Sequence, residues 1–199
     1  MSDRLIESAS QTAGPYVHIG CLPSWAGIDG IYPEDLGATI AGPGARGERI
    51  TLKGRIFDGA GEPLRDSMVE LWQADAAGLY QSPGEYRGAA DPDFRGWGRA
   101  ATDADTGLYR FDTILPGAVR SGGVTHAPHV ALWIVARGIN LGLHTRAYFA
   151  GLPENAADPV LTLPELAGRV DTLLAVRDGG TWTFDIHLQG GRETVFFDV

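Results

Sequence analysis

The chain has 199 residues, a hydrophobic fraction of 44% and a formal charge of −9. This length suits one domain with a sizeable core, and the acidic charge argues against nucleic acid or anionic lipid as a partner. No apolar run approaches the roughly 20 residues that span a bilayer, and the polar start lacks the features of a secretory signal. Because Cys21 is the single cysteine and cannot form an internal disulfide, these features together predict a cytoplasmic protein.

The first 48 residues show no sustained helical or strand periodicity. In residues 8–20, Gly14 precedes Pro15, which predicts a stiff, extended bend that presents Tyr16. Residues 21–48 carry three prolines among several glycines. Long irregular stretches in compact domains are typically binding or interface loops. Residues 1–48 are therefore expected to form an N-terminal arm and an irregular segment at an interface or an active site.

From residue 49 onward the sequence changes to short strands separated by turns rich in Gly, Asp and Pro. Strands are predicted at residues 50–56, 67–72, 108–113, 129–135, 181–188 and 193–199. In the fourth of these, alternation places His129 and Ala131 on one face and Val130, Leu132 and Ile134 on the other. Residues 49–199 are therefore predicted to form an antiparallel β-sandwich with long loops.

One helix is predicted in this mainly-β domain, between residues 164 and 178. Pro164 can take the first helical position, and Leu166, Val170 and Leu173 repeat at helical spacing. Two glycines at positions 179 and 180 end the segment. The fold class is thus mainly β, with an extended arm and one or two short helices.

Three of the five histidines lie between residues 125 and 149. A histidine at position 131 would share a strand face with His129 and form a metal-binding pair, but this position holds Ala131. His126 lies three residues before His129, across a proline, so the two do not share a strand face. One reading is a metal site built from this chain alone. The other is that His129 is buried and satisfied by the backbone, while His126 and His144 lie at the surface or an interface.

Three stretches carry a resemblance to a known family: VELWQADAAGLYQ at 69–81, DPDFRGWGRAATDADTGLYRFDTILPG at 91–117, and APHVALWIVARG at 127–138. They resemble the intradiol ring-cleaving dioxygenases and, within them, the protocatechuate 3,4-dioxygenases. The resemblance covers nearly the whole chain and departs mainly at residues 21–48 and 81–99. It implies a β-sandwich fold whose catalytic chain holds ferric iron through two tyrosines and two histidines.

The resemblance assigns each iron-ligand position to a residue of this sequence. Tyr80 matches the first tyrosine and His129 the first histidine, whereas Val119 stands at the second tyrosine and Ala131 at the second histidine. Valine and alanine cannot donate to iron. The resemblance therefore implies a chain without its own metal, paired with a β chain of related fold that binds the Fe(III), and a structural role for Tyr80 and His129.

The resemblance also implies a substrate-facing surface. It places Thr12, Gly14, Pro15 and Tyr16 along a pocket and directs Arg137 toward the ring carboxylate of protocatechuate. A guanidinium forms charge-assisted hydrogen bonds with such a carboxylate. The alternative for Arg137 is an ion pair with a local acid or a structural role at the end of the strand.

Three functions remain open at this point. The first is an α-type subunit that completes the active site of an iron-bearing β chain, for intradiol cleavage of protocatechuate by O2 to 3-carboxy-cis,cis-muconate. The second is a self-sufficient metalloenzyme in which groups such as His126 replace the missing ligands. The third is a non-catalytic β-sandwich that acts as a binding or scaffold module. We favour the first, because ligands are missing at two separate positions, Val119 and Ala131.

Overall fold

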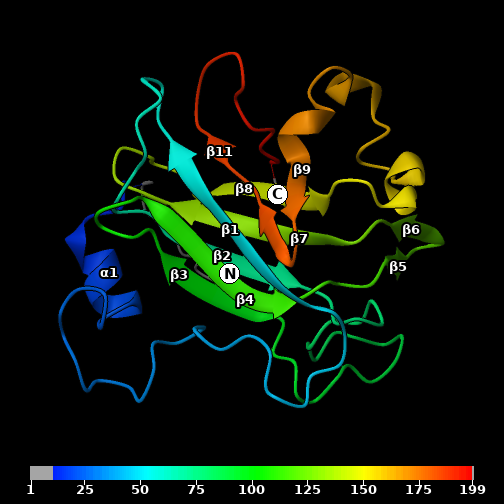
Figure 1. Cartoon of the computed structure of the whole chain (residues 1–199), viewed down its shortest axis with the longest axis horizontal. Helices are drawn as coiled ribbons and strands as arrows, with labels where there is room; N and C mark the ends of the chain where they lie inside the picture. Colours follow the sequence, from blue (N-terminus) through cyan, green and yellow to red (C-terminus); the bar gives the residue numbers. More distant parts are fainter. Residues whose placement is uncertain (1–10, 199) are drawn as a thin grey trace, which may run out of the picture.

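The computed structural model describes residues 11–198 (Figure 1). The helical segments are α1 (Pro15–Cys21) and the 3-10 helices η1 (Pro153–Ala157), η2 (Pro164–Leu166) and η3 (Val170–Leu173). The strands are β1 (Arg49–Phe57), β2 (Met68–Gln73), β3 (Trp97–Ala101), β4 (Leu108–Ile114), β5 (Val119–Ser121), β6 (Val124–His126), β7 (His129–Val135), β8 (Leu143–Phe149), β9 (Leu174–Asp178), β10 (Thr181–Thr183) and β11 (Ile186–His187). No helix within the described range is long and apolar enough to cross a membrane.

The main sheet has the strand order β11-β1-β10-β9-β8-β7-β2-β3, and β4 pairs with β1. Most neighbours are antiparallel, but β1 runs parallel to β10 and β11, and β8 runs parallel to β9. The predicted mainly-β fold is confirmed, whereas the sheet is mixed and curves toward a barrel instead of forming a purely antiparallel sandwich. The long connection through residues 150–173 is one cause, because it brings the chain back alongside Tyr148 and Phe149 at the end of β8, where β9 begins in the same direction.

The side chains of β7 alternate between two environments, as the sequence predicts. Val130, Leu132 and Ile134 are buried in the main hydrophobic core. His129 and Ala131 project from the opposite face of the same strand. The β2–β7–β8 ladder therefore has a core face and an outer face, and the candidate metal-ligand positions of β7 belong to the outer face.

The predicted helix at residues 164–178 is wrong. Gly168 has a positive φ of 82° and separates η2 from η3, and the chain then enters β9 at Leu174. The helically spaced residues Leu166 and Leu173 are buried together in a second, smaller core cluster. Two short turns thus bury the same apolar side chains that a helix would bury, and they leave residues 174–178 free to pair with β8 and β10.

The predicted C-terminal strands are shorter than expected. Residues 181–188 form β10 and β11 with an interruption at Phe184 and Asp185, where the Asp185 carboxylate accepts the backbone N–H of Arg55 over 2.9 Å. This side chain takes the place of a backbone carbonyl and so breaks the ladder. At the C-terminus, the described residues contribute only an isolated bridge between Phe197 and His144, while Val199 lies outside the described range.

The N-terminal segment is not an extended bend throughout. Gly14 is extended, but Pro15 opens helix α1, since a proline at the first helical position loses no intrahelical hydrogen bond. The remainder up to residue 48 contains no named helix or strand, as predicted. Residues 1–10 of the expected arm lie outside the described residues.

One buried hydroxyl forms a hydrogen bond at the interruption between β10 and β11. Tyr109 is fully buried and donates its hydroxyl hydrogen to the Phe184 carbonyl. Tyr109→Phe leaves that buried carbonyl without this donor, so we expect the free energy of unfolding to fall by about 1–3 kcal/mol in urea denaturation. Tyr86→Phe, at a side chain that is 83% exposed, is the matched control and should change it by less than about 0.5 kcal/mol. Equal losses in the two variants would contradict this role.

Candidate functional site

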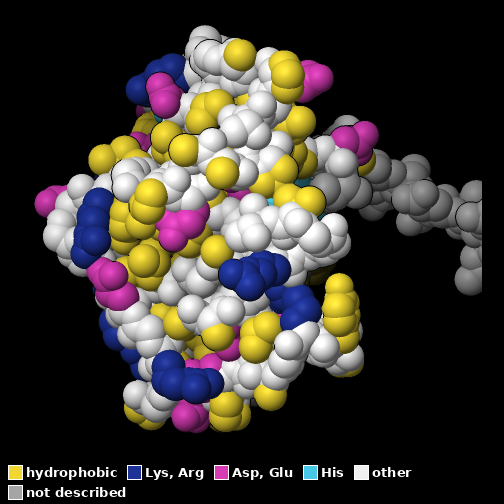
Figure 2. All heavy atoms as spheres, turned by 90° about the vertical axis from the view of Figure 1, so that its right-hand side faces the viewer, with side chains coloured by type: hydrophobic (Ala, Val, Ile, Leu, Met, Phe, Trp, Pro, Cys, Tyr) yellow, Lys and Arg dark blue, Asp and Glu magenta, His cyan; other side chains and the backbone are white. Residues whose placement is uncertain are grey.

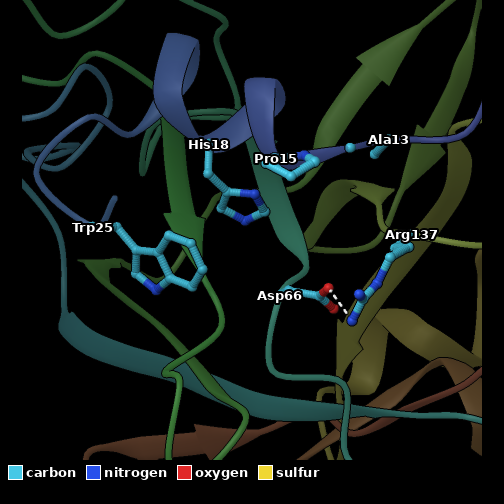
Figure 3. A pocket seen from close by; sticks show the side chains of 7 residues that line it. Ala13, Pro15, His18, Trp25, Asp66 and Arg137 are labelled. Carbon is cyan, nitrogen blue, oxygen red and sulfur yellow. Dashed lines mark ion pairs between the residues drawn. The ribbon is translucent and has the colours of Figure 1, made fainter. Parts of the chain in front are cut away.

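The N-terminal segment, the loop before β2 and the end of β7 line a cavity of about 200 Å³. Gly14 and Pro15 at the start of α1 contribute to its wall, and Arg137 contributes from the loop after β7 (Figure 3). Arg137 Nη2 lies 2.8 Å from Asp66 Oδ2, while the Arg137 side chain remains 76% exposed. The guanidinium is therefore oriented by an ion pair and still has donors available to a ligand.

The other two predicted pocket residues occupy different positions. Thr12 Oγ1 accepts the backbone N–H of Gly138 over 2.7 Å, which ties the arm to the loop that carries Arg137. Tyr16 follows Pro15 in α1 and is 84% exposed, so within this chain it projects outward and does not line the cavity. Thr12 thus ties the N-terminal segment to the loop that carries Arg137, whereas the Tyr16 side chain is exposed on the surface of α1.

Four further wall residues were missed by sequence reasoning: Ala13, His18, Trp25 and Asp66. Asp66 pairs with Arg137, and His18 lies one helical turn after Pro15, facing the cavity (Figure 3). The Trp25 ring lies 4.3 Å from the His18 ring, between centroids, and Trp25 Nε1 donates to the Thr102 carbonyl over 3.1 Å. The helical spacing from Pro15 to His18 could have indicated that both residues share one face of a helix. It was overlooked because this segment was expected to be extended.

A second hollow, of about 280 Å³, contains two of the positions that match iron ligands. Tyr80 and Val119 both line it. The Tyr80 ring stacks on Trp72 at 5.8 Å between centroids with an interplanar angle of 3°, and the Arg87 guanidinium lies 5.9 Å from the Tyr80 centroid. Burial raises the pKa of the Tyr80 hydroxyl above its ordinary value. Tyr80 is consequently a packed, neutral phenol.

The other two positions adjoin this hollow through the strand pairing. Ala131 is paired with Trp72 on β2 and with Arg146 on β8. His129 donates from Nδ1 to the Ala127 carbonyl over 2.7 Å, and its ring lies 5.3 Å from that of Tyr148. The structure therefore brings all four positions to one end of the outer face of the sheet.

The side chains at these positions do not fit a ferric site. Only Tyr80 and His129 carry donor atoms, so two of the four ligands are missing. The Nδ1 hydrogen bond of His129 leaves Nε2 as its one ring nitrogen that could bind a metal. The proposed replacement ligand, His126, has its ring centroid 6.0 Å from that of His129 and its Nδ1 3.7 Å from the Asp158 carboxylate. His144 instead stacks on Trp133. Residues 11–198 contain no group of three or more His, Cys, Asp or Glu side chains that could hold a metal ion.

Comparisons with known proteins give a consistent result. The family model described as "Dioxygenase" matches residues 33–190. The protocatechuate 3,4-dioxygenase alpha chain of Pseudomonas putida is 46% identical over 200 residues, which cover 98% of this chain and 97% of the relative. The beta chain of Burkholderia cepacia is 41% identical over 126 residues, covering 61% of this chain and 53% of the relative. The dioxygenase domain of a carbohydrate-binding fusion protein from Streptomyces sp. SirexAA-E superimposes with a TM-score of 0.58 at 27% identity, over 76% of this chain and 86% of that domain.

The chain belongs to the dioxygenase family. The family match spans more than half of the chain, and the similarity to an alpha chain of protocatechuate 3,4-dioxygenase extends over almost its full length. The resemblance inferred from the sequence motifs is thereby confirmed.

The burial of His129 predicts a pH-dependent stability. Desolvation lowers the pKa of the imidazole to about 4, while the unfolded chain takes up the proton near pH 6.5. The contribution of His129 to the free energy of unfolding is therefore complete above pH 6.5. As the pH falls toward 4, the free energy of unfolding decreases by up to roughly 3 kcal/mol through this group. Urea denaturation of wild type and His129→Gln between pH 4.5 and 7.5 should show a flatter profile for the variant. His144→Gln, at an exposed position, should keep the wild-type slope, and identical slopes in all three proteins would contradict the assignment.

Proposed function

We propose that this chain is the subunit without iron in a two-chain protocatechuate 3,4-dioxygenase. The observation that carries the proposal is the similarity, over almost its full length, between this chain and an alpha chain of that enzyme. In this chain, two of the four ligand positions hold valine and alanine. Its partner is a β chain that binds the Fe(III). The pair cleaves protocatechuate with O2 between the two hydroxylated carbons and yields 3-carboxy-cis,cis-muconate.

Strand geometry supports a role for Arg137 at a partner's site. His129 and Arg137 are eight positions apart, at opposite ends of β7 and its extension. At about 3.3 Å per residue, this extended segment spans roughly 26 Å. Arg137 therefore cannot reach a substrate in the hollow next to Tyr80. It can serve only a substrate at its own end of the strand, where the N-terminal segment lies.

The substrate chemistry agrees with this position. Protocatechuate carries a ring carboxylate, and the Arg137 guanidinium combines a fixed orientation, through Asp66, with high exposure. A charge-assisted hydrogen bond of this kind is worth about 1.5–3 kcal/mol. Arg137 thus binds the carboxylate and helps to select protocatechuate over catechols without that group.

The N-terminal segment supplies the rest of the contact surface. Thr12 ties the arm beside Arg137, Gly14 and Pro15 form the neighbouring cavity wall, and the exposed Tyr16 side chain on α1 is available to contact the partner's site. Large apolar side chains stay exposed along the same segment at Ile19, Trp25, Ile28, Ile31, Tyr32 and Leu36. Exposed patches of this kind mark interfaces. We therefore assign residues 1–48 to the contact with the β chain and to the shared site, and residues 49–199 to the β-sandwich unit that carries them. We infer from the single cysteine that the assembly is cytoplasmic.

Co-expression with an iron-competent β chain tests the subunit assignment. A tagged form of this chain should co-purify with that β chain as a coloured complex with ferric-tyrosinate absorption and ring-cleaving activity. The same chain purified alone should lack both the colour and the activity. Activity and stoichiometric iron in the isolated chain would establish a self-sufficient metalloenzyme instead, and failure to form a complex would favour a scaffold module.

Arg137→Ala tests the substrate contact. We expect kcat/KM for protocatechuate to fall roughly 10- to 100-fold, mainly through KM, because the carboxylate loses a charge-assisted hydrogen bond. Turnover of catechol, which lacks the carboxylate, should change little, and Arg137→Lys should recover part of the loss. Arg110→Ala, at an exposed arginine of β4, is the control. Loss of iron from the complex, or an equal loss for both substrates, would refute the role.

A further inference from the structure

Helix α1 carries part of the candidate site but has little packing of its own to hold it. It has seven residues, of which one is buried. Before its start, the Thr12 hydroxyl accepts the backbone N–H of Gly138. Gly14 and Pro15, which form part of the cavity wall, lie between that contact and the end of the helix at Cys21. The position of this wall therefore depends on what holds the end of α1.

The Arg99 side chain makes a contact at that end. Its Nη1 donates to the carbonyl of Cys21, the last residue of α1, over 3.4 Å. Carbonyls in the last turn of a helix lack a partner within the helix, so this contact supplies one. Figure 1 shows α1 beside β3, the strand that carries Arg99. The guanidinium thus connects the end of the helix to the main sheet.

The Arg99 guanidinium is itself fixed by its neighbours on the sheet. Its Nε donates to Glu70 Oε1 over 2.8 Å, and its Cζ lies 5.0 Å from the centroid of the Trp97 ring. Arg99 and Glu70 are paired across the β2–β3 ladder. Many positively charged side chains stand at the surface, as the face in Figure 2 shows, but the Arg99 and Glu70 side chains are only 16% and 19% exposed. Solvent screens such a pair weakly, so the pair holds Nη1 in one direction.

The backbone of Arg99 holds the segment that follows α1. Its N–H donates to the Gly37 carbonyl over 3.1 Å. A Cβ at position 37 would lie 2.6 Å from the Arg99 nitrogen, and Gly37 has a positive φ of 86°, so this close approach requires glycine. Beyond β3, the Thr102 carbonyl accepts Trp25 Nε1. Because β3 is the last strand in the sheet order, the N-terminal segment covers an edge that would otherwise be unpaired.

We propose that Arg99 is a positioning residue for the shared site, because it places α1, and with it Gly14 and Pro15, against the substrate. This inference rests on the proposed function. Arg99 does not line the cavity, so it acts through the helix and not by touching the substrate. Without its contact, α1 is in place in only a fraction of the complexes, and the apparent dissociation constant rises by the inverse of that fraction. The effect falls on substrate binding and not on the chemical step.

Kinetics of the reconstituted complex test this role. Arg99→Met should raise KM roughly tenfold for protocatechuate and for catechol alike, at unchanged kcat per bound iron, because α1 loses a hydrogen bond from a charged donor. The equal effect on both substrates separates this role from that of Arg137, whose contact concerns the carboxylate. A merely structural loss would lower the amount of active complex and leave KM unchanged. Arg110→Met removes an exposed arginine that pairs with Asp112, and as the control it should leave KM unchanged.

Hydrogen exchange of the isolated chain tests the tether without the partner. In Arg99→Met, the amides of residues 17–22 should exchange roughly tenfold faster than in wild type and in Arg110→Met. Arg99→Lys guards against misfolding, since lysine keeps the ion pair with Glu70 while its compact ammonium does not extend to Cys21. It should change both the exchange and KM in the same direction as Arg99→Met, and it decides the matter if Arg99→Met does not fold.

Three results would overturn the inference. Unchanged exchange of residues 17–22 would show that Arg99 does not hold α1. Faster exchange with an unchanged KM in an active complex would remove the positioning role and leave the proposed function intact. An inactive wild-type complex with an iron-competent β chain would refute the proposed function, and the positioning role with it.

Discussion

The register between β7 and its two neighbours determines where every candidate functional side chain lies. Antiparallel pairing with β2 and β8 holds Val130 and Leu132 in the core. A shift of one residue would exchange the faces, placing His129 in the core and these aliphatic side chains outside. Burial therefore fixes the register strongly. Once the register is fixed, Ala131 and Arg146 lie opposite each other on the outer face of the sheet.

The same strand also separates two sites with different requirements. At its beginning, Tyr80 and His129 are packed against neighbouring rings, a suitable environment for structural side chains. At its end, Arg137 is exposed and held by Asp66, and the arm is tied to the next residue through Thr12. A rigid strand gives Arg137 a fixed origin, while the ion pair gives its guanidinium a direction. Such preorganisation reduces the entropy lost when a ligand is bound.

The sequence predicted the parts of the fold that depend on local alternation. The strands around residues 50–56 and 129–135 follow a period of two, and burial of one face enforces it. The predicted helix at 164–178 failed because Gly168 adopts a positive φ, and because pairing with β8 and β10 outweighs helical spacing. Helix α1 was missed because Gly14-Pro15 signals a bend and a helix start equally well.

The candidate site was only partly accessible from the sequence. The four ligand positions came from family motifs and not from periodicity, since Val119 has no local feature that marks it. Asp66 and Trp25 were missed because tertiary contacts alone bring them to Arg137 and His18. Cross-strand neighbours such as Arg146 become visible only once the register is known. Sequence patterns thus identify a strand and its faces, whereas the partners across the ladder need the structure.

The acidic character of the chain is compatible with the proposed role toward an anionic substrate, because the two act over different distances. A formal charge of −9 repels an anion at long range, but at physiological ionic strength such fields decay over about 8 Å. Within that distance, the exposed guanidinium of Arg137 determines the local potential, and Asp66 offsets only part of it. An anion that reaches the cavity therefore meets a cation with available donors, although the molecule as a whole is acidic. Under the proposed function, specificity for a carboxylate would follow from this short-range contact and not from electrostatic steering.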